Sequence, residues 1–437
     1  MSVADYGIVN TFTSYTSIFF MIVGLTLHSS IKNANLDYPN DVDSYCSSLT
    51  ILIIGCFVLS LLISICFRNE LSGLLSLDHP FLLSFIVADS FCLAMITYYN
   101  CVLAVNYRYK EYLMLSLAYS VSGIGFSVLF ILIFHSSVSY LGRILGTCIS
   151  SAMVTIFILY RLYRKSVPKV NMEFWKYGLK ISLPVIPHGI SQIILAQFDR
   201  LIIKSTIGNE EAGLYSFAYT LGTVYQVVAN SIDTAWSQWL FEQMAAKNYS
   251  KIRKIANYYA GILALGAIML MLISPELVLI MGGTKYRPSR QVTLPIILSM
   301  FYAAMYAMPA SLEYFYKKTK LIAIATTAAA GLNIVLNMIY IPKYGYIAAA
   351  YTTVACYLIY YAMHMVFAYK IHGSMLYDVK WQGLCVFVVT LAVFVCQCLM
   401  EYLLLRAVII MTGLFAFLMI GIRMKEKWMR LFKAFKS

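Results

Sequence analysis

Long apolar segments follow one another along almost the whole sequence. The hydrocarbon core of a bilayer is about 30 Å thick, and a helix needs about 20 apolar residues to cross it. Thirteen segments reach roughly that length, at 8–29, 46–67, 81–104, 112–134, 138–160, 177–203, 212–235, 256–281, 291–312, 321–341, 346–369, 382–400 and 402–422. Because a helix satisfies its own backbone hydrogen bonds inside lipid, this pattern predicts an all-α polytopic membrane protein with about 13 transmembrane helices.

The composition excludes most other classes of protein. The chain is 61% hydrophobic and 12% charged, with a mean hydropathy of +0.76. The net charge of +14 therefore reflects membrane topology rather than nucleic-acid binding. The cysteines lie mostly inside apolar segments and form no CxxC pair, so we expect neither disulfides nor a metal site. No phosphate-binding Gly-x-x-x-x-Gly-Lys-Ser/Thr loop occurs, so we expect no cofactor, no ATP binding and no enzymatic activity.

Lysine and arginine residues gather in alternate connections between the predicted spans. One set of connections holds most of them, around 32, 108–110, 161–176, 247–254, 317–320, 370–380 and 423–436. The opposite set holds few, among them Arg68 and Lys343. Because basic loops stay on the cytoplasmic side of a membrane, we expect the first set and the C-terminus to be cytoplasmic. An odd number of spans then leaves the N-terminus outside.

Two weak internal repeats predict the domain organisation. The segment Asp5–Asn10 resembles Glu211–Ser216, and each opens a span from the outer side; residues 109–110 and 319–320 each precede two spans. Repeats of this kind indicate duplicated bundles. We therefore expect two pseudo-symmetric six-helix bundles, at 1–165 and 166–372, followed by two helices and a basic tail at 373–437. The repeat demands a helix before Met1, so we expect the coding sequence to extend upstream.

The predicted span at 177–203 carries unusual residues for a membrane helix. Pro184, His188, Gln192 and Asp199 fall on one face at helical spacing. Pro184 and Pro187 each remove a backbone donor, which predicts a hinge. This polar face either lines a cavity or marks a structural kink whose polar groups are satisfied. His188 could titrate during transport, although a single membrane histidine is more often a hydrogen-bonded packing residue.

Two further spans carry polar residues at helical spacing. These are Gln226, Asn230 and Asp233 in the span at 212–235, and Asn333 and Asn337 in the span at 321–341. Polar side chains at membrane depth must face protein or water. Interhelical hydrogen bonding explains some of them, whereas stripes on several helices favour a shared aqueous cavity.

Several of these segments resemble a known family. They are Leu183–His188, Asp199–Ile203, Ile207–Tyr215, the pair Asn333 and Asn337, and Ile341–Gly345. Together they resemble the second half of Wzx-type polysaccharide flippases, which transport O-antigen and capsule units. These flippases belong to the MOP superfamily, which also contains the MATE multidrug exporters. The resemblance extends over nearly the whole chain.

The resemblance implies a function and a location. It implies a flippase that moves undecaprenyl-diphosphate-linked oligosaccharide from the cytoplasmic to the outer leaflet of the bacterial plasma membrane by alternating access. The product would serve O-antigen, capsule or exopolysaccharide biosynthesis. The implied partners are the lipid-linked cargo, membrane lipids, and the polysaccharide polymerase with its chain-length machinery.

Charged residues inside the predicted spans are the sharpest candidates for a site. A charge costs about 2.5–3.5 kcal/mol at the centre of a lipid-exposed helix. A diphosphate needs cations, so Arg143, Lys180 and Arg200 are the candidate anion-binding residues. Asp89 and Asp233 are candidates for cation coupling or for ion pairs with these basic residues.

Two alternative functions stay open at this point. A cation-coupled multidrug exporter of the MATE type would have an acidic or apolar cavity, whereas the candidate charges here are mostly basic. A membrane polysaccharide polymerase or glycosyltransferase would need a sizeable catalytic outer loop. The longest outer connection, around 68–80, has only about a dozen residues.

Overall fold

The computed structural model describes residues 1–134 and 138–423, except for the side chains of residues 36, 188, 319 and 414–423. Every regular element within these ranges is a helix. The chain divides into two compact units, Met1–Ser216 and Phe217–Ser437, and each is described by itself. The predicted all-α class is confirmed.

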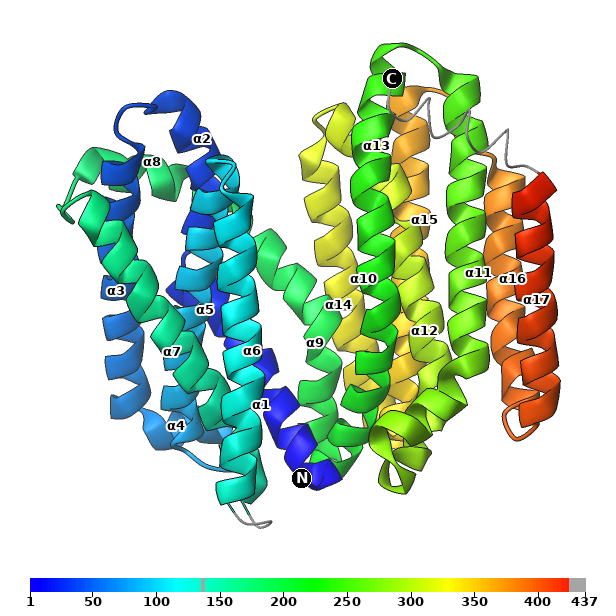
Figure 1. Ribbon diagram of the computed structural model, residues 1–437, viewed down its shortest axis with the longest axis horizontal. Helices are drawn as coiled ribbons and strands as arrows, with labels where there is room; N and C mark the ends of the chain where they lie inside the picture. The colour runs from blue at the N-terminus through cyan, green and yellow to red at the C-terminus, as the bar shows by residue number, and fades with distance from the viewer. Residues whose placement is uncertain (135–137, 424–437) are drawn as a thin grey trace. The chain divides into compact units, whose positions relative to one another are not determined.

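The first unit is built from long helices joined by short connections. Its helices are α1 (Val3–Val23), α2 (Ile31–Asp37), α3 (Val42–Cys66), α4 (Arg68–Leu74), α5 (Leu82–Val105), α6 (Tyr109–Ile133), α7 (Ser139–Lys165), α8 (Met172–Ser182), α9 (Ile186–Thr206) and the start of α10 (Asn209–Ala245). The short helices α2 and α8 lie at one end of the unit and α4 at the other (Figure 1).

The helix α5 is the centre of the first unit. It packs against α1, α3 and α7, while α6 and α7 form a hairpin and α9 packs along α1. Tyr45 of α3 and Met95 and Tyr98 of α5 are fully buried in the core of this unit. Lipid is as apolar as such a core, so close packing and interhelical hydrogen bonds, rather than exclusion of water, hold membrane helices together.

The second unit contains the rest of α10 and the remaining helices. They are α11 (Tyr249–Gly282), α12 (Arg290–Met305), α13 (Ala307–Phe315), α14 (Thr319–Tyr344), α15 (Tyr346–His372), α16 (Val379–Cys398) and α17 (Leu403–Arg423). The helix α12 is apolar and buried on almost every side, as expected of a central helix. It packs against α11, α15 and α16.

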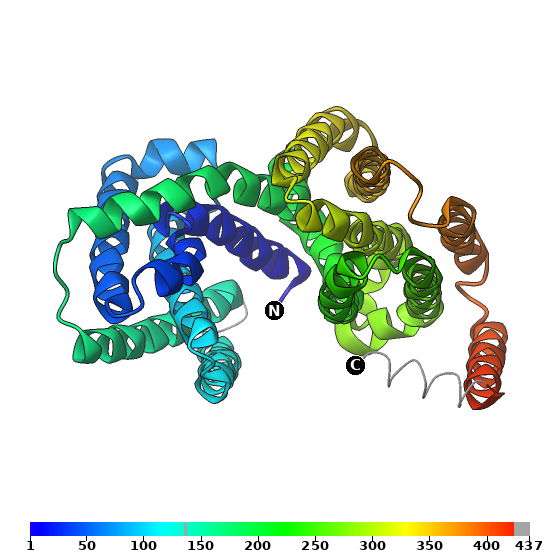
Figure 2. The same cartoon turned by 90° about the horizontal axis from the view of Figure 1, so that it is seen from above.

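The hairpin of α14 and α15 turns at Gly345, whose φ of 73° would strain any residue with a side chain. Outside the bundle, α16 packs against α11 and α12, and α17 contacts α11. Seen from the side and from above, α17 lies beyond α16 at the edge of the unit (Figure 1, Figure 2).

The two units share an order of helix neighbours. In the first, α3 packs on α5, α5 on α7, and α6 pairs with α7; in the second, α11 packs on α12, α12 on α15, and α14 pairs with α15. The sequence repeat predicts such a parallel. The superposition of two pseudo-symmetric six-helix bundles stays a prediction, as do the lobe boundaries at 165 and 372.

Ten helices of the described chain are long and apolar enough to span a membrane, and eleven if the bent pair α8–α9 counts as one span. The protein is therefore a multi-pass membrane protein. The other two of the 13 predicted spans fall in α10 and α17. Polar residues interrupt α10 along its length, and the side chains of α17 are described only to Gly413.

Candidate functional site

The helix α9 carries a cluster of charged and polar side chains that contact its neighbours. The carboxylate of Asp199 accepts a hydrogen bond of 2.6 Å from the hydroxyl of Tyr215 at the start of α10, and both residues are buried. The guanidinium of Arg200, also buried, donates to the side-chain oxygen of Gln197. Gln197 accepts a second hydrogen bond of 3.2 Å from Ser14 of α1. The cluster thus connects α9 to both α1 and α10.

One turn further along α9, Lys204 forms an ion pair with Asp78, which lies in the connection before α5. The Lys204 Nζ atom is 2.5 Å from Asp78 Oδ2, and the Asn209 amide donates to Asp78 Oδ1 at 2.7 Å. Burial alone would raise the pKa of Asp78, but the hydrogen bonds from Lys204 and Asn209 outweigh it and lower that pKa below its ordinary value.

Two glycines allow the helices α1 and α10 to begin in direct contact. A Cβ atom on Gly7 would overlap the carbonyl oxygen of Asn209, and a Cβ atom on Gly213 would overlap the carbonyl oxygen of Val3. The contact is reciprocal. Val3 and Asn209 each lie four residues before the glycine of their own helix, and the carbonyl of each faces the glycine of the other helix. Only glycine permits so close an approach of two backbones.

The bend predicted near the two prolines is present in the backbone. The segments Met172–Val185 and Gly189–Thr206 meet at 45°. Pro184 and Pro187 are exposed at this bend, Lys180 is exposed in the last turn of α8, and Gln192 is half-buried on α9. The side chain of His188 lies outside the described residues.

Arg143 and Asp89 lie on two other helices of the first unit, α7 and α5. Arg143 of α7 donates a 2.9 Å hydrogen bond to Ser127 of α6. Asp89 of α5 accepts a 2.6 Å hydrogen bond from Ser151 of α7. Asp89 and Arg143 form no ion pair with each other in the described chain, so the ion-pair alternative for these two residues is not realised.

The polar residues of α10 lie in the second unit. Gln226 donates to Asn230 at 3.0 Å within the helix, and Asn230 is exposed. Asp233 is half-buried and lies beside the hydroxyls of Tyr259 on α11 and Ser237 on its own helix.

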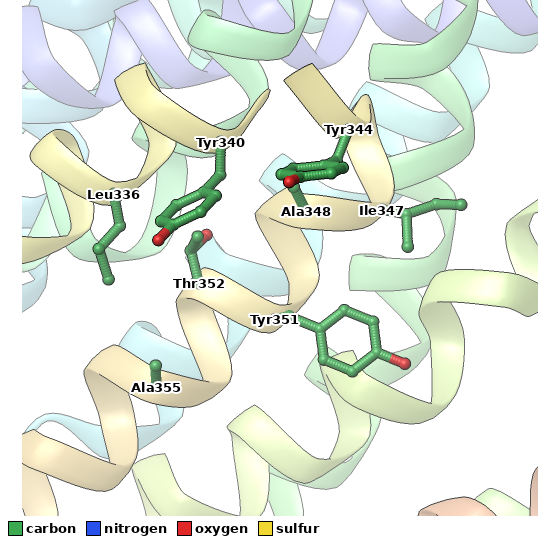
Figure 3. A pocket seen from close by; sticks show the side chains of 8 residues that line it. All are labelled: Leu336, Tyr340, Tyr344, Ile347, Ala348, Tyr351, Thr352 and Ala355. Atoms are coloured by element: carbon green, nitrogen blue, oxygen red, sulfur yellow. The ribbon is translucent and has the colours of Figure 1, made fainter. Parts of the chain in front are cut away.

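Asn333 and Asn337 of α14 are fully buried. The Asn337 amide donates to Asn333 at 3.1 Å, and the hydroxyl of Thr352 on α15 donates to Asn337. This arrangement holds two helices together. Thr352 also borders a pocket of about 480 Å³, with the rings of Tyr340, Tyr344 and Tyr351 around it (Figure 3).

The sequence reasoning missed a buried acid–base pair in the second unit. His364 Nδ1 of α15 lies 2.5 Å from Glu313 Oε1 of α13, and neither side chain is exposed. Glu313 falls just past the predicted span at 291–312, where a carboxylate could sit at the membrane interface. His364 falls inside the span at 346–369, so a titratable residue at membrane depth was the available signal.

A second missed pair joins α17 to the bundle. The guanidinium of Arg406 donates to both carboxylate oxygens of Glu276 on α11, at 2.6 and 2.5 Å, and to the Leu272 carbonyl oxygen at 2.7 Å. The arginine side chain is almost fully buried. Among the described residues, no group of three His, Cys, Asp or Glu side chains could hold a metal ion.

Comparisons with known proteins bear on the family. The family model for "Polysaccharide biosynthesis protein" matches residues 1–242. A protein of the Lsg locus of Haemophilus influenzae is 22% identical to this chain over 339 residues, which are 74% of this chain and 79% of the relative.

Two solved structures bear on the fold. The lipid II flippase MurJ, in an inward closed conformation, matches with a TM-score of 0.69 and 15% identity over 97% of both chains. An inward-facing multidrug resistance MATE transporter of the MOP superfamily matches with a TM-score of 0.62 and 15% identity, over 85% of this chain and 93% of that one. Both likenesses show a fold of the MOP type. Because the family model covers more than half of the sequence, the chain belongs to the polysaccharide biosynthesis protein family, as its Wzx-like residues indicated.

Proposed function

We propose that the protein is a flippase that moves a lipid-linked oligosaccharide from the cytoplasmic to the outer leaflet of the bacterial plasma membrane. The observation that carries this proposal is the family match over residues 1–242, which includes the polar helix α9 and the start of α10. The fold shared with MurJ and the MATE transporters supports a transporter in which two helical lobes alternate in access.

The proposed cargo is an undecaprenyl-diphosphate oligosaccharide used for O-antigen, capsule or exopolysaccharide. A diphosphate prefers guanidinium groups, which offer planar, bidentate donors. Arg200 is buried on α9 and donates to Gln197, and Arg143 donates to a neutral hydroxyl of α6. A neutral partner does not cancel the charge of a cation, so Arg143 keeps a positive charge for an anion, and Arg200 is the second proposed contact. Lys180 is the third proposed contact.

The proposed mechanism uses the bend between α8 and α9. Pro184 and Pro187 weaken the backbone hydrogen bonding there, so this segment is our proposed hinge. Gln192, Asp199 and His188 on the same helix are proposed cavity residues, together with Gln226 and Asn230 of α10. Asn333 and Asn337 of α14, which bond to each other and to Thr352, are proposed cavity residues as well.

The proposed orientation places the basic connections and the C-terminus in the cytoplasm. In that orientation the α9–α10 connection and the ion pair of Lys204 and Asp78 lie on the outer side. The polysaccharide polymerase and chain-length machinery would receive the cargo there and are the proposed partners.

The test is surface polysaccharide in a deletion strain complemented with single variants, with membrane expression checked for each. We expect Arg143→Ala and Arg200→Ala to reduce surface polysaccharide strongly. A lost charged hydrogen bond costs about 1.5–3 kcal/mol, which weakens binding about tenfold to a hundredfold. Arg143→Lys should be partly active, because lysine keeps the charge but loses the fork.

The matched control is Lys110→Ala, which removes an exposed cation at the start of α6. It should complement fully. Full complementation by the alanine variants of Arg143, Lys180 and Arg200 would show that these cations do not bind the cargo. Failure of the purified protein to move a labelled lipid-linked oligosaccharide across proteoliposomes would refute the flippase function itself.

A further inference from the structure

The pair of Glu313 and His364 is an ionisable site that the proposed cargo path does not use. Both side chains are fully buried, and the 2.5 Å contact joins Glu313 Oε1 to His364 Nδ1. The other atoms of the pair, Glu313 Oε2 and His364 Nε2, have no hydrogen-bond partner in the part of the chain that the structure describes. A buried ionisable pair with spare polar atoms calls for a physical explanation.

Aromatic rings surround the imidazole. The rings of Tyr306 and Tyr360 lie 5.4 and 4.6 Å from that of His364, centre to centre. Tyr360 is fixed in turn by a 2.9 Å hydrogen bond with Thr326 of α14.

The other ionisable groups near the pair are acids or tyrosines. Tyr314 of α13 and Tyr377, in the connection after α15, lie close enough to interact electrostatically with Glu313. Asp233 of α10 interacts with Tyr306 and Tyr314. Among the described residues, His364 is the one basic group that interacts with Glu313.

Charge balance decides how many protons the pair holds. With one proton the pair is neutral overall, whichever of the two side chains carries it. Without a proton it is a buried anion, and with two protons it is a buried cation. Both charged states carry a large desolvation cost in an apolar interior. The closed pair therefore holds one proton.

The helix that carries Glu313 is short and follows α12 after a one-residue break at Tyr306, and Pro309 cannot donate a hydrogen bond to the carbonyl of Met305. Backbone hydrogen bonds from Tyr306 to Tyr302 and from Ala310 to Tyr306 cross this break. Beyond this break, α13 packs against α14 and α15, and Ser311 bonds to Ser237 of α10 at 2.9 Å. The contact of Glu313 with His364 is thus one of the few polar side-chain contacts that attach the nine-residue helix Ala307–Phe315 to the rest of the unit.

We propose that Glu313 and His364 form a proton-binding site that fastens α13 to α15 and releases its proton to water when α13 moves away. In water, glutamate and histidine titrate near about 4.3 and 6.5. Above about pH 6.5 the separated groups hold no proton while the closed pair holds one. Opening therefore releases one proton in that range. A role in driving transport rests on the proposed function, but the proton site does not.

The test is hydrogen exchange of the full-length protein in nanodiscs, measured by mass spectrometry from pH 5 to 8.5 without any cargo. After correction for the chemical rate of exchange, opening of Ala307–Phe315 should increase about tenfold per pH unit above about pH 6.5. Between about pH 5 and 6 it should be constant, because the separated groups then also hold one proton. Peptides from α16 serve as the internal reference.

Two variants separate the proton site from ordinary packing. Glu313→Gln makes the closed site neutral without a proton, so its opening should not depend on pH above about 6.5. Below about 6.5 its opening should increase as the pH falls, because the separated histidine then takes up a proton. In His364→Gln the buried carboxylate must hold the proton itself, so the pH dependence should begin near about 4.3 instead of 6.5. The control Glu242→Gln removes an exposed acid of α10 and should keep the wild-type profile.

Two results would overturn the proposal. The first is opening of Ala307–Phe315 in the wild type that does not depend on pH, which needs no variant to fold. The second is a wild-type profile in Glu313→Gln. Because no cargo is present in these measurements, a failure of the flippase function in the complementation assay would leave their outcome unchanged.

Discussion

The two units of the molecule handle buried charge in different ways. In Met1–Ser216, Asp89 and Arg143 are hydrogen-bonded to hydroxyl groups, which are neutral. In Phe217–Ser437, Glu313 is bonded to His364 and Arg406 to Glu276, so each charge meets a group of opposite sign.

The difference has a chemical consequence. A neutral dipole stabilises a charge without cancelling it, so such a charge still attracts a ligand of opposite sign. An opposite charge cancels the field at a distance and leaves a neutral pair that acts locally. We therefore expect the charged residues that bind a ligand mainly in the first unit. Opposite-charge pairs that join two helices or bind a proton are expected mainly in the second.

The two units differ much less in how their helices pack than in the partners of their buried charged residues. Each unit packs the same order of neighbouring helices, and the glycine-led starts of α1 and α10 make reciprocal contacts. A shared backbone plan with unlike charges is the expected result if duplicated bundles kept their packing and diverged in the residues that bind ions.

The largest expected effect comes from breaking the pair that anchors α17. Glu276→Ala would leave the Arg406 guanidinium buried without its carboxylate, which costs about 3–5 kcal/mol for a fully buried pair. We expect about 3 kcal/mol, because the Glu276 side chain is 32% exposed. The measurement is thermal or denaturant unfolding of the purified protein in detergent.

A matched control tests whether burial is the reason. Glu401 lies 3.6 Å from both Arg287 and Arg290, but its side chain is 68% exposed. Glu401→Ala should therefore cost less than about 1 kcal/mol. Equal losses from Glu276→Ala and Glu401→Ala would contradict the view that pairs in the second unit act through burial.

The second expected effect concerns the shared backbone plan. Gly7→Ala and Gly213→Ala each place a methyl group against a carbonyl oxygen of the facing helix. Overpacking of this kind costs about 1–3 kcal/mol, and the reciprocal contact predicts similar losses from the two variants. The measurement is again unfolding of the purified protein.

Gly331→Ala is the control for that comparison, since a Cβ atom at Gly331 of α14 would meet no neighbouring atom. There alanine should be neutral or stabilising by up to about 1 kcal/mol, because it is the better helix former. A large loss from Gly7→Ala and none from Gly213→Ala would show that the two helix starts are not equivalent.

Much of the fold could be predicted from the sequence, because the length and apolarity of a span are local properties. The bend at Pro184 and Pro187 was predictable for the same reason, since proline acts on its own turn of helix. The 13 predicted spans exceed the ten or eleven that the described helices support, because polar residues interrupt α10 and the side chains of α17 are described only to Gly413.

The candidate site was harder to predict, because helical spacing shows which residues share a face but not what that face meets. Asn333 and Asn337 share a face as expected, yet they meet each other and Thr352. Glu313 and His364 lie on different helices, far apart in the sequence, and no periodicity connects them. A partner across two helices appears only once the packing is known.

The smallest expected effect tests an exception in the first unit. Lys204 and Asp78 form an opposite-charge pair, as the residues of the second unit do. The pKa of Asp78 is lowered in the folded protein, so its contribution to stability is complete above its unfolded value of about 3.9 and is lost as the pH falls below that value. We expect a contribution of about 1 kcal/mol, since the Asp78 side chain is partly exposed. Asp78→Asn should reduce the loss of stability between pH 6 and 3, and Asp41→Asn, at an exposed loop position, should leave it unchanged. If Asp78→Asn keeps the wild-type slope, the pair does not stabilise the end of α9.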